Sequence, residues 1–182
     1  MDLYQILVAY NPAWTVREVI FFVFVFIAAL LSARHLLRQE RIRLSQAISG
    51  LFLLTFLAIV FGSTVFTRMP TGQHQYELEL FWSWKLVAKG NRFMLQENLL
   101  NLLLLFPAGI LLPWVWGRKV HVWQGLLIGM GISLMIELCQ LVLGRGLFEW
   151  DDIVHNGLGC MAGCILCTCF LYRGRNEGDG TQ

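Results

Sequence analysis

Long apolar runs alternate with short charged segments along this chain. Each run has close to the ~20 residues that a helix needs to cross a bilayer. The pattern therefore predicts an all-α, polytopic integral membrane protein, with about five transmembrane helices packed in a compact bundle. The runs occupy residues 16–33, 44–67, 98–117, 122–143 and 153–172.

The segments at the two ends differ from this pattern. Residues 1–15 are expected to form an interfacial segment, and residues 16–172 to form one transmembrane domain. Residues 173–182 are rich in glycine and charge, which predicts a short disordered tail. The first residues lack the positive region of a secretory signal, so the first apolar run is expected to remain as a span.

Composition agrees with a membrane location. Hydrophobic residues make up 57% of the chain, against about 45–50% in soluble domains. The net charge of +2 is too small for a nucleic-acid-binding surface, so no nucleic-acid partner is expected. All five cysteines lie within apolar runs, which is typical of small packing residues rather than a metal site.

The basic residues predict an orientation. Residues 34–43, 117–121 and the tail from 173 hold eight of the 14 Lys and Arg residues, although they are short. Basic residues in short loops favour the cytoplasmic side of a membrane. We therefore expect a bacterial multi-pass cell-membrane protein with its N-terminus outside and its C-terminus in the cytoplasm.

This orientation brings polar residues of three helices to the extracytoplasmic face. Glu137 is the most informative of them, because a carboxylate inside a span costs roughly 2.5–3.5 kcal/mol on insertion scales and usually has a function. Ser133, Glu137 and Gln140 follow the spacing of one helix face. Asp152 and Asn156 do the same in the last helix.

These polar residues predict an outward-facing polar pocket. Glu137, Asp152 and His155 are candidate catalytic residues, because they can transfer protons. No metal site is assigned, although Asp151 and Asp152 offer carboxylate ligands to a divalent cation. The candidate ligand-binding residues are Glu97, Asn98, Asn101, Ser133, Gln140, Arg145, Asp151 and Asn156.

A purely structural interpretation competes with this one, because polar side chains often join membrane helices. Under it, the four amides of Asn98, Asn101, Gln140 and Asn156 satisfy one another, and Arg145 pairs with an acid. The outer segment 67–97 allows two interpretations as well. Its aromatic residues, among them Trp82 and Trp84, indicate either an interfacial belt or a lid over the pocket.

Three ordered motifs resemble the VanZ-like family of bacterial membrane proteins over roughly residues 50–172. Two positions depart mildly from the family pattern, since Glu149 stands where Asp is usual and Ala108 where Leu is usual. The motifs are Glu97-Asn98-x-x-Asn101 with Phe106-Pro107-x-Gly109, then Ser133-x-x-x-Glu137-x-x-Gln140, then Arg145-x-x-Phe148-x-x-Asp151-Asp152 with Asn156-x-x-Gly159-x-x-x-Gly163.

The namesake of that family confers low-level resistance to the lipoglycopeptide teicoplanin. The resemblance therefore implies a cell-envelope protein that lowers susceptibility to such antibiotics, with membrane lipid, a lipidated glycopeptide or a lipid-linked envelope precursor as partner. Two alternatives stay open: an enzyme acting on a lipid-linked phosphate at the outer leaflet, and a small transporter. The sequence leaves open whether any reaction is catalysed, since it contains no nucleophile motif, Walker loop or zinc signature.

Overall fold

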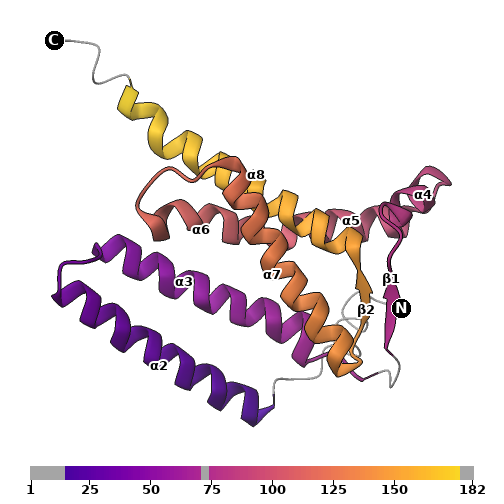
Figure 1. The fold of residues 1–182 in the computed structure, drawn as a ribbon, viewed down its shortest axis with the longest axis horizontal. Helices are drawn as coiled ribbons and strands as arrows, with labels where there is room; N and C mark the ends of the chain where they lie inside the picture. The colour runs from indigo at the N-terminus through magenta and orange to yellow at the C-terminus, as the bar shows by residue number, and fades with distance from the viewer. Residues whose placement is uncertain (1–14, 71–73, 177–182) are drawn as a thin grey trace.

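The computed structural model describes residues 15–70 and 74–176, and most of these residues are helical (Figure 1). Of the predicted interfacial segment, only Thr15 is described, and of the predicted tail, only residues 173–176. The rest of both segments lies outside the described residues. The helices are α2 Val16–Arg38, α3 Leu44–Phe61, η1 Gly62–Phe66, α4 Trp82–Ala88, α5 Arg92–Leu104, α6 Phe106–Trp116, α7 Val122–Leu143 and α8 Trp150–Asn176.

Among the described residues, five helical segments have the length and apolar character to cross a membrane, which confirms the predicted all-α polytopic fold. α3 and η1 form one span, and so do α5 and α6. The span made by α5 and α6 breaks at Leu105, because Pro107 has no N–H to donate to the preceding turn. α8 continues to Asn176, so residues 173–176 are helical where the sequence predicts disorder.

α8 is the central helix of the bundle and packs against α5, α6 and α7. Its glycines allow this close approach, as the small-xxx-small patterns predict. A Cβ on Gly159 would lie 1.8 Å from the Leu102 carbonyl oxygen, and one on Gly163 would lie 2.2 Å from that of Phe106. The backbones of α5, α6 and α8 are therefore in direct contact.

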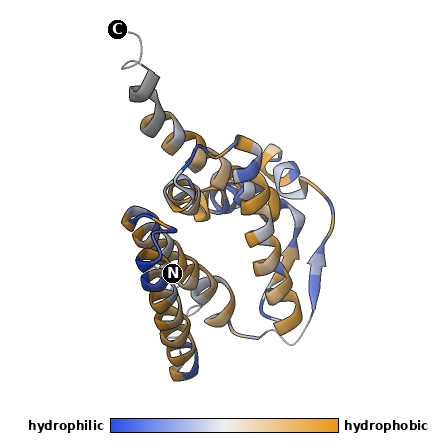
Figure 2. Ribbon diagram, turned by 60° about the vertical axis from the view of Figure 1, so that its left-hand side comes forward, coloured by the Kyte–Doolittle hydropathy of each residue, from blue (hydrophilic) through white to orange (hydrophobic). Residues whose placement is uncertain are grey.

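α2 packs mainly against α3 and lies at the edge of the molecule. Figures 1 and 2 show the two helices side by side, with apolar residues along both. None of the residues of α2 is buried. An apolar helix without buried residues is typical of a span that faces lipid, because lipid takes the place of protein neighbours.

Two three-residue strands join the outer segment to the start of α8. β1 Gln75–Glu77 and β2 Leu147–Glu149 pair in parallel, with Tyr76 opposite Phe148. The pairing draws α4 toward the first turn of α8, at the end of the bundle where α7 finishes (Figure 1). The polar residues of the three motifs meet at this end.

Candidate functional site

A polar cavity of about 460 Å³ lies where α5, α7 and α8 meet β2 and α4. It combines charged and amide side chains with aromatic and aliphatic ones. Its polar lining is Arg68, Glu97, Asn101, Gln140, Glu149 and Asp152. Its apolar lining is Trp82, Phe93, Met94, Leu100 and Leu147.

Asp152 is the point at which the three helices are joined. The Asn101 amide of α5 donates to Asp152 Oδ1 at 2.5 Å. The Ser133 hydroxyl of α7 donates to the Asp152 backbone oxygen at 3.3 Å. Asn156 then donates to the Ser133 hydroxyl at 2.8 Å. The Asp152 carboxylate is thus held toward the cavity by a network of neutral donors.

Glu137 is 2% exposed and supports the cavity rather than lining it. Its Oε2 accepts a hydrogen bond from the Glu149 N–H at 3.0 Å. The carboxylate therefore holds the end of β2 against α7. Gln140, one turn further along α7, donates to the Thr64 carbonyl oxygen at 3.1 Å and ties the second span to the same place.

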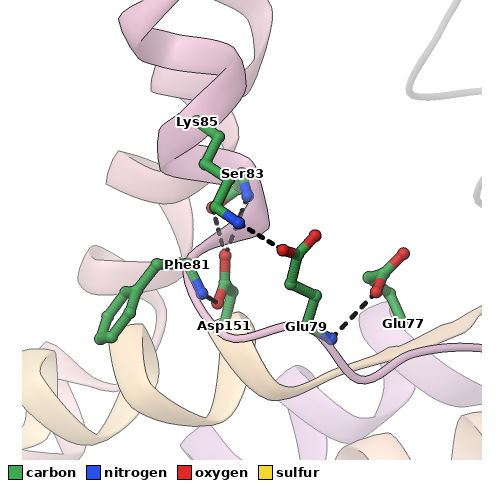
Figure 3. Close-up of polar contacts among 6 residues, drawn as sticks. All are labelled: Glu77, Glu79, Phe81, Ser83, Lys85 and Asp151. Carbon is green, nitrogen blue, oxygen red and sulfur yellow. Dashed lines mark hydrogen bonds and ion pairs between the residues drawn. The ribbon is translucent and has the colours of Figure 1, made fainter.

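Asp151 is 1% exposed and holds the outer segment in place. Its carboxylate accepts hydrogen bonds from the Phe81 N–H and from the N–H and hydroxyl of Ser83, the last two at 3.1 and 2.5 Å. Figure 3 shows the carboxylate pointing at the first residues of α4. Asn98 donates to the same Ser83 hydroxyl at 3.1 Å. Asp151 thus acts as the N-terminal cap of α4, although it comes from another helix.

His155 lies beneath α4 and not in the cavity. Its Nε2 accepts a hydrogen bond from the Trp84 indole N–H at 2.7 Å, and the two rings meet edge to face. Its Nδ1 is buried without a partner among residues 15–70 and 74–176. Trp84 and Ser83 therefore both attach α4 to α8.

The prediction that Arg145 pairs with an acid is wrong. Arg145 Nη1 donates to the carbonyl oxygens of Val65 and Phe66 instead. The described part of the chain contains one ion pair between side chains, and it joins Lys85 to Glu79 rather than Arg145 to an acid (Figure 3). The carbonyls at the end of η1 lack partners within the helix, so they are available to accept hydrogen bonds from this guanidinium.

The prediction that the four amides bond to one another is also wrong. Each amide donates to an acceptor of another kind: a hydroxyl, a carboxylate or a backbone carbonyl. The acceptors are the Ser83 hydroxyl for Asn98, the Asp152 carboxylate for Asn101, the Thr64 carbonyl for Gln140 and the Ser133 hydroxyl for Asn156. The polar residues form a site that includes backbone and loop groups, because the end of η1 and the start of α4 enter the space between the helix ends.

Arg68 and Ser83 are site residues that the sequence does not single out, whereas Trp82 belongs to the aromatic residues for which a lid was one interpretation. Arg68 lines the cavity and acts electrostatically on Glu97 and Asp152. In the sequence it resembles any basic residue that follows a span, and Ser83 carries no motif. The one sequence feature that could have pointed to Ser83 is the run of aromatic residues on either side of it.

The acidity of Glu149 is changed by its burial in the cavity wall and by the neighbouring acids. Burial raises the pKa of Glu149 to about 7, and the charges of Asp152 and Glu97 act in the same direction. Glu149 is therefore divided between its neutral and ionised forms near neutral pH. A carboxyl group with such a pKa can give or take a proton at little cost.

Metal ligation is a separate question at Asp151 and Asp152. Residues 15–70 and 74–176 contain no group of three or more His, Cys, Asp or Glu residues placed to hold a metal ion. The oxygens of Asp151 already accept three protein donors, and Asp152 accepts from Asn101. A cation at this pair would compete with those donors.

Of the comparisons with known proteins, the one with protein families gives a match. No curated protein and no solved structure matches the chain. The model of the VanZ/LLP1 family matches residues 44–171. This range begins at α3 and includes all three polar motifs and almost every residue that lines the cavity. The match covers well over half of the sequence, and the chain therefore belongs to the VanZ/LLP1 family.

Proposed function

We propose that this VanZ-like membrane protein binds a lipid or a lipidated ligand in its polar cavity and thereby lowers susceptibility to lipoglycopeptides such as teicoplanin. The mixed lining of the cavity carries the proposal. Charged and amide groups of α5, α7 and α8 line it together with the apolar side chains of Trp82, Phe93 and Leu100. Such a lining suits a molecule with a polar head beside an apolar part.

Size and position support the same proposal. The volume of about 460 Å³ falls within the ~300–1,000 Å³ of typical small-molecule sites. Glu149 and Arg68 lie just outside the spans, whereas Asn101 and Gln140 lie within them. The cavity thus reaches from the end of the bundle into the apolar region, where a head group and the start of its tail would lie.

A susceptibility measurement tests the proposed role. The gene is deleted in its host and restored as wild type, as Asp152→Asn or as Ile59→Trp. Asp152 lines the cavity, whereas Ile59 is exposed on the lipid-facing side of α3. We expect wild type and Ile59→Trp to restore tolerance of teicoplanin but not of vancomycin, and Asp152→Asn to restore neither. Equal responses to both antibiotics, at equal membrane abundance, would contradict the proposal.

The proposed orientation places this cavity on the extracytoplasmic side. The support is the concentration of basic residues in 34–43, 117–121 and the tail. Single cysteines at Lys89 and at Gln39, in a cysteine-free background, are treated on intact cells with a membrane-impermeant maleimide. Labelling at Lys89 alone is expected. Labelling at Gln39 alone would show that the orientation is the opposite of the one proposed.

An enzyme that acts on a lipid-linked phosphate is the second candidate function. The favouring observation is Glu149, whose pKa of about 7 suits a general acid or base, beside Arg68, which can contact phosphate oxygens. Purified protein is incubated with an undecaprenyl-linked phosphate, and product is followed by mass spectrometry. Turnover that Glu149→Gln abolishes and Ile59→Trp preserves would favour this candidate, whereas equal turnover in the two variants would count against it.

A further inference from the structure

A second cavity of about 600 Å³ lies between α2 and α3. Its lining is almost wholly apolar. The two charged residues that line it, Arg17 and Glu18, belong to the first turn of α2. The apolar residues are Phe21, Phe22, Val25, Leu54, Leu57, Ala58, Phe61 and Phe66.

The two cavities are separated by one short segment. Phe66 lines the apolar cavity and Arg68 lines the polar one. Their Cα atoms lie two residues apart, which limits their separation to about 7 Å. The segment is fixed in place, because Arg145 donates to the Phe66 carbonyl and Gln140 to the Thr64 carbonyl. Both cavities therefore lie at the same end of the bundle, one on each side of this segment.

The charges of the polar cavity indicate which head group would occupy it. Three carboxyl groups line it, those of Glu97, Glu149 and Asp152, against the single guanidinium of Arg68. Even with Glu149 partly protonated near neutral pH, the acids outnumber the base. Carboxylates close to the apolar region are costly unless a cation accompanies them. A ligand with an ammonium group would balance this excess, and Arg68 would accept a phosphate or carboxylate on the same head.

We infer that one amphiphile occupies both cavities, with an ammonium-bearing head in the polar cavity and a hydrocarbon tail between α2 and α3. The inference rests on the proposed binding of a lipid or lipidated ligand, and it adds the charge of the head and the site of the tail. Phenylalanine rings from both helices line the tail site. The polar end of the tail site, at Arg17 and Glu18, lies in the outermost turn of the span, where a tail meets its head.

Photolabelling of the full-length protein in vesicles of phosphatidylglycerol, a lipid whose head has no ammonium group, tests this inference. The probe is phosphatidylethanolamine with a diazirine in one acyl chain, and its control is the same lipid with an N-acetylated head. We expect labelled peptides from α2 and α3, at residues 21–25 and 54–61. The N-acetylated lipid should label them about tenfold less, as loss of ~1.4 kcal/mol of head-group attraction implies.

Matched variants locate the two parts of the ligand. Ala58→Trp fills the apolar cavity, whereas Ile59→Trp adds the same ring on the exposed side of α3. Ala58→Trp and Asp152→Asn should each reduce labelling by phosphatidylethanolamine about tenfold, on the same free-energy scale, and Ile59→Trp should not. If Ala58→Trp fails to accumulate in the membrane, the comparison of the two lipids on wild-type protein still decides.

Three results would overturn the inference: equal labelling by the two lipids, labelling that Asp152→Asn leaves unchanged, and labelling that is absent from residues 21–25 and 54–61. None of these bears on the susceptibility assay. If Asp152→Asn loses teicoplanin tolerance and the tail site fails these tests, the proposed function stands and the inference is wrong. If labelling follows the inference and tolerance is unaffected, the binding site stands and the resistance role is wrong.

Discussion

Asp151 is predicted to control whether α4 stays attached to the bundle. Asp151→Asn keeps the shape of the side chain but removes its charge and turns one acceptor oxygen into a donor NH₂ group. In the wild type, the carboxylate accepts from the N–H groups of Phe81 and Ser83 and from the Ser83 hydroxyl. At least one of these buried donors loses its acceptor in the variant.

The size of the effect follows from these bonds. Hydrogen bonds to a charged group are worth roughly 1.5–3 kcal/mol each, and a buried donor left without an acceptor costs about 1–3 kcal/mol. Because the three bonds share one carboxylate, we expect a net loss of about 3 kcal/mol for docking of α4. Since ~1.4 kcal/mol corresponds to a factor of ten, α4 should open about a hundredfold more often.

Hydrogen exchange measured by mass spectrometry on the peptide 81–88 reports this opening directly. Exchange in Asp151→Asn should be about two orders of magnitude faster than in wild type. Ser83→Ala is the matched control, because it removes one hydroxyl and keeps both backbone bonds to Asp151. It also removes the acceptor of the Asn98 amide, and it should accelerate exchange by about tenfold, since one hydrogen bond to a charged group is worth about 1.5 kcal/mol or more. Unchanged exchange in Asp151→Asn, or a larger effect of Ser83→Ala, would refute the reasoning.

Further predictions concern packing, pH and the end of the second span. Gly159→Ala should destabilise the detergent-purified protein by about 1–3 kcal/mol in thermal unfolding, because its Cβ would meet the Leu102 carbonyl; Gly131→Ala, which meets no atom within 4 Å, should not. Folding raises the pKa of Glu149 to about 7, so its stabilising contribution is present at acid pH and is lost as pH rises through 7. Glu149→Gln should thus gain stability over wild type between pH 5 and 8; a constant difference would be evidence against this. Arg145→Met should lower the free energy of unfolding by about 1–3 kcal/mol, since it leaves two carbonyls at the end of the second span without their donor; an unchanged melting temperature would contradict it.

Hydrophobic length was enough to predict the spans. α7 begins and ends at the predicted residues, because His121 precedes the apolar run and Gly144 adopts the left-handed conformation that ends a helix. α8 differs from the prediction at its last residues. A glycine-rich, charged tail favours disorder, yet residues 173–176 continue the helix since no helix-breaking proline follows the span.

The site was predictable only in part, and the reason is sequence distance. Asp152 and Asn101 carry motif positions on helix faces, and they do meet. The partners of Asp151 lie in a segment about 70 positions earlier, whose three-residue strand is too short to leave an alternating pattern. Glu137 lies near the C-terminal end of α7 and bonds to the β2 backbone, a contact that no periodicity reveals.

The attachment of α4 to Asp151 also sets an order of events during synthesis. Phe81 leaves the ribosome 70 residues before Asp151 does, and chains fold from the N-terminus as they are made. Until the last span enters the membrane, β1 has no strand partner and the donors of Phe81 and Ser83 have no carboxylate. A chain truncated before α8 would leave these groups without their partners, and quality-control proteases can recognise such an incomplete fold. The cavity is therefore complete only after the last span has been inserted.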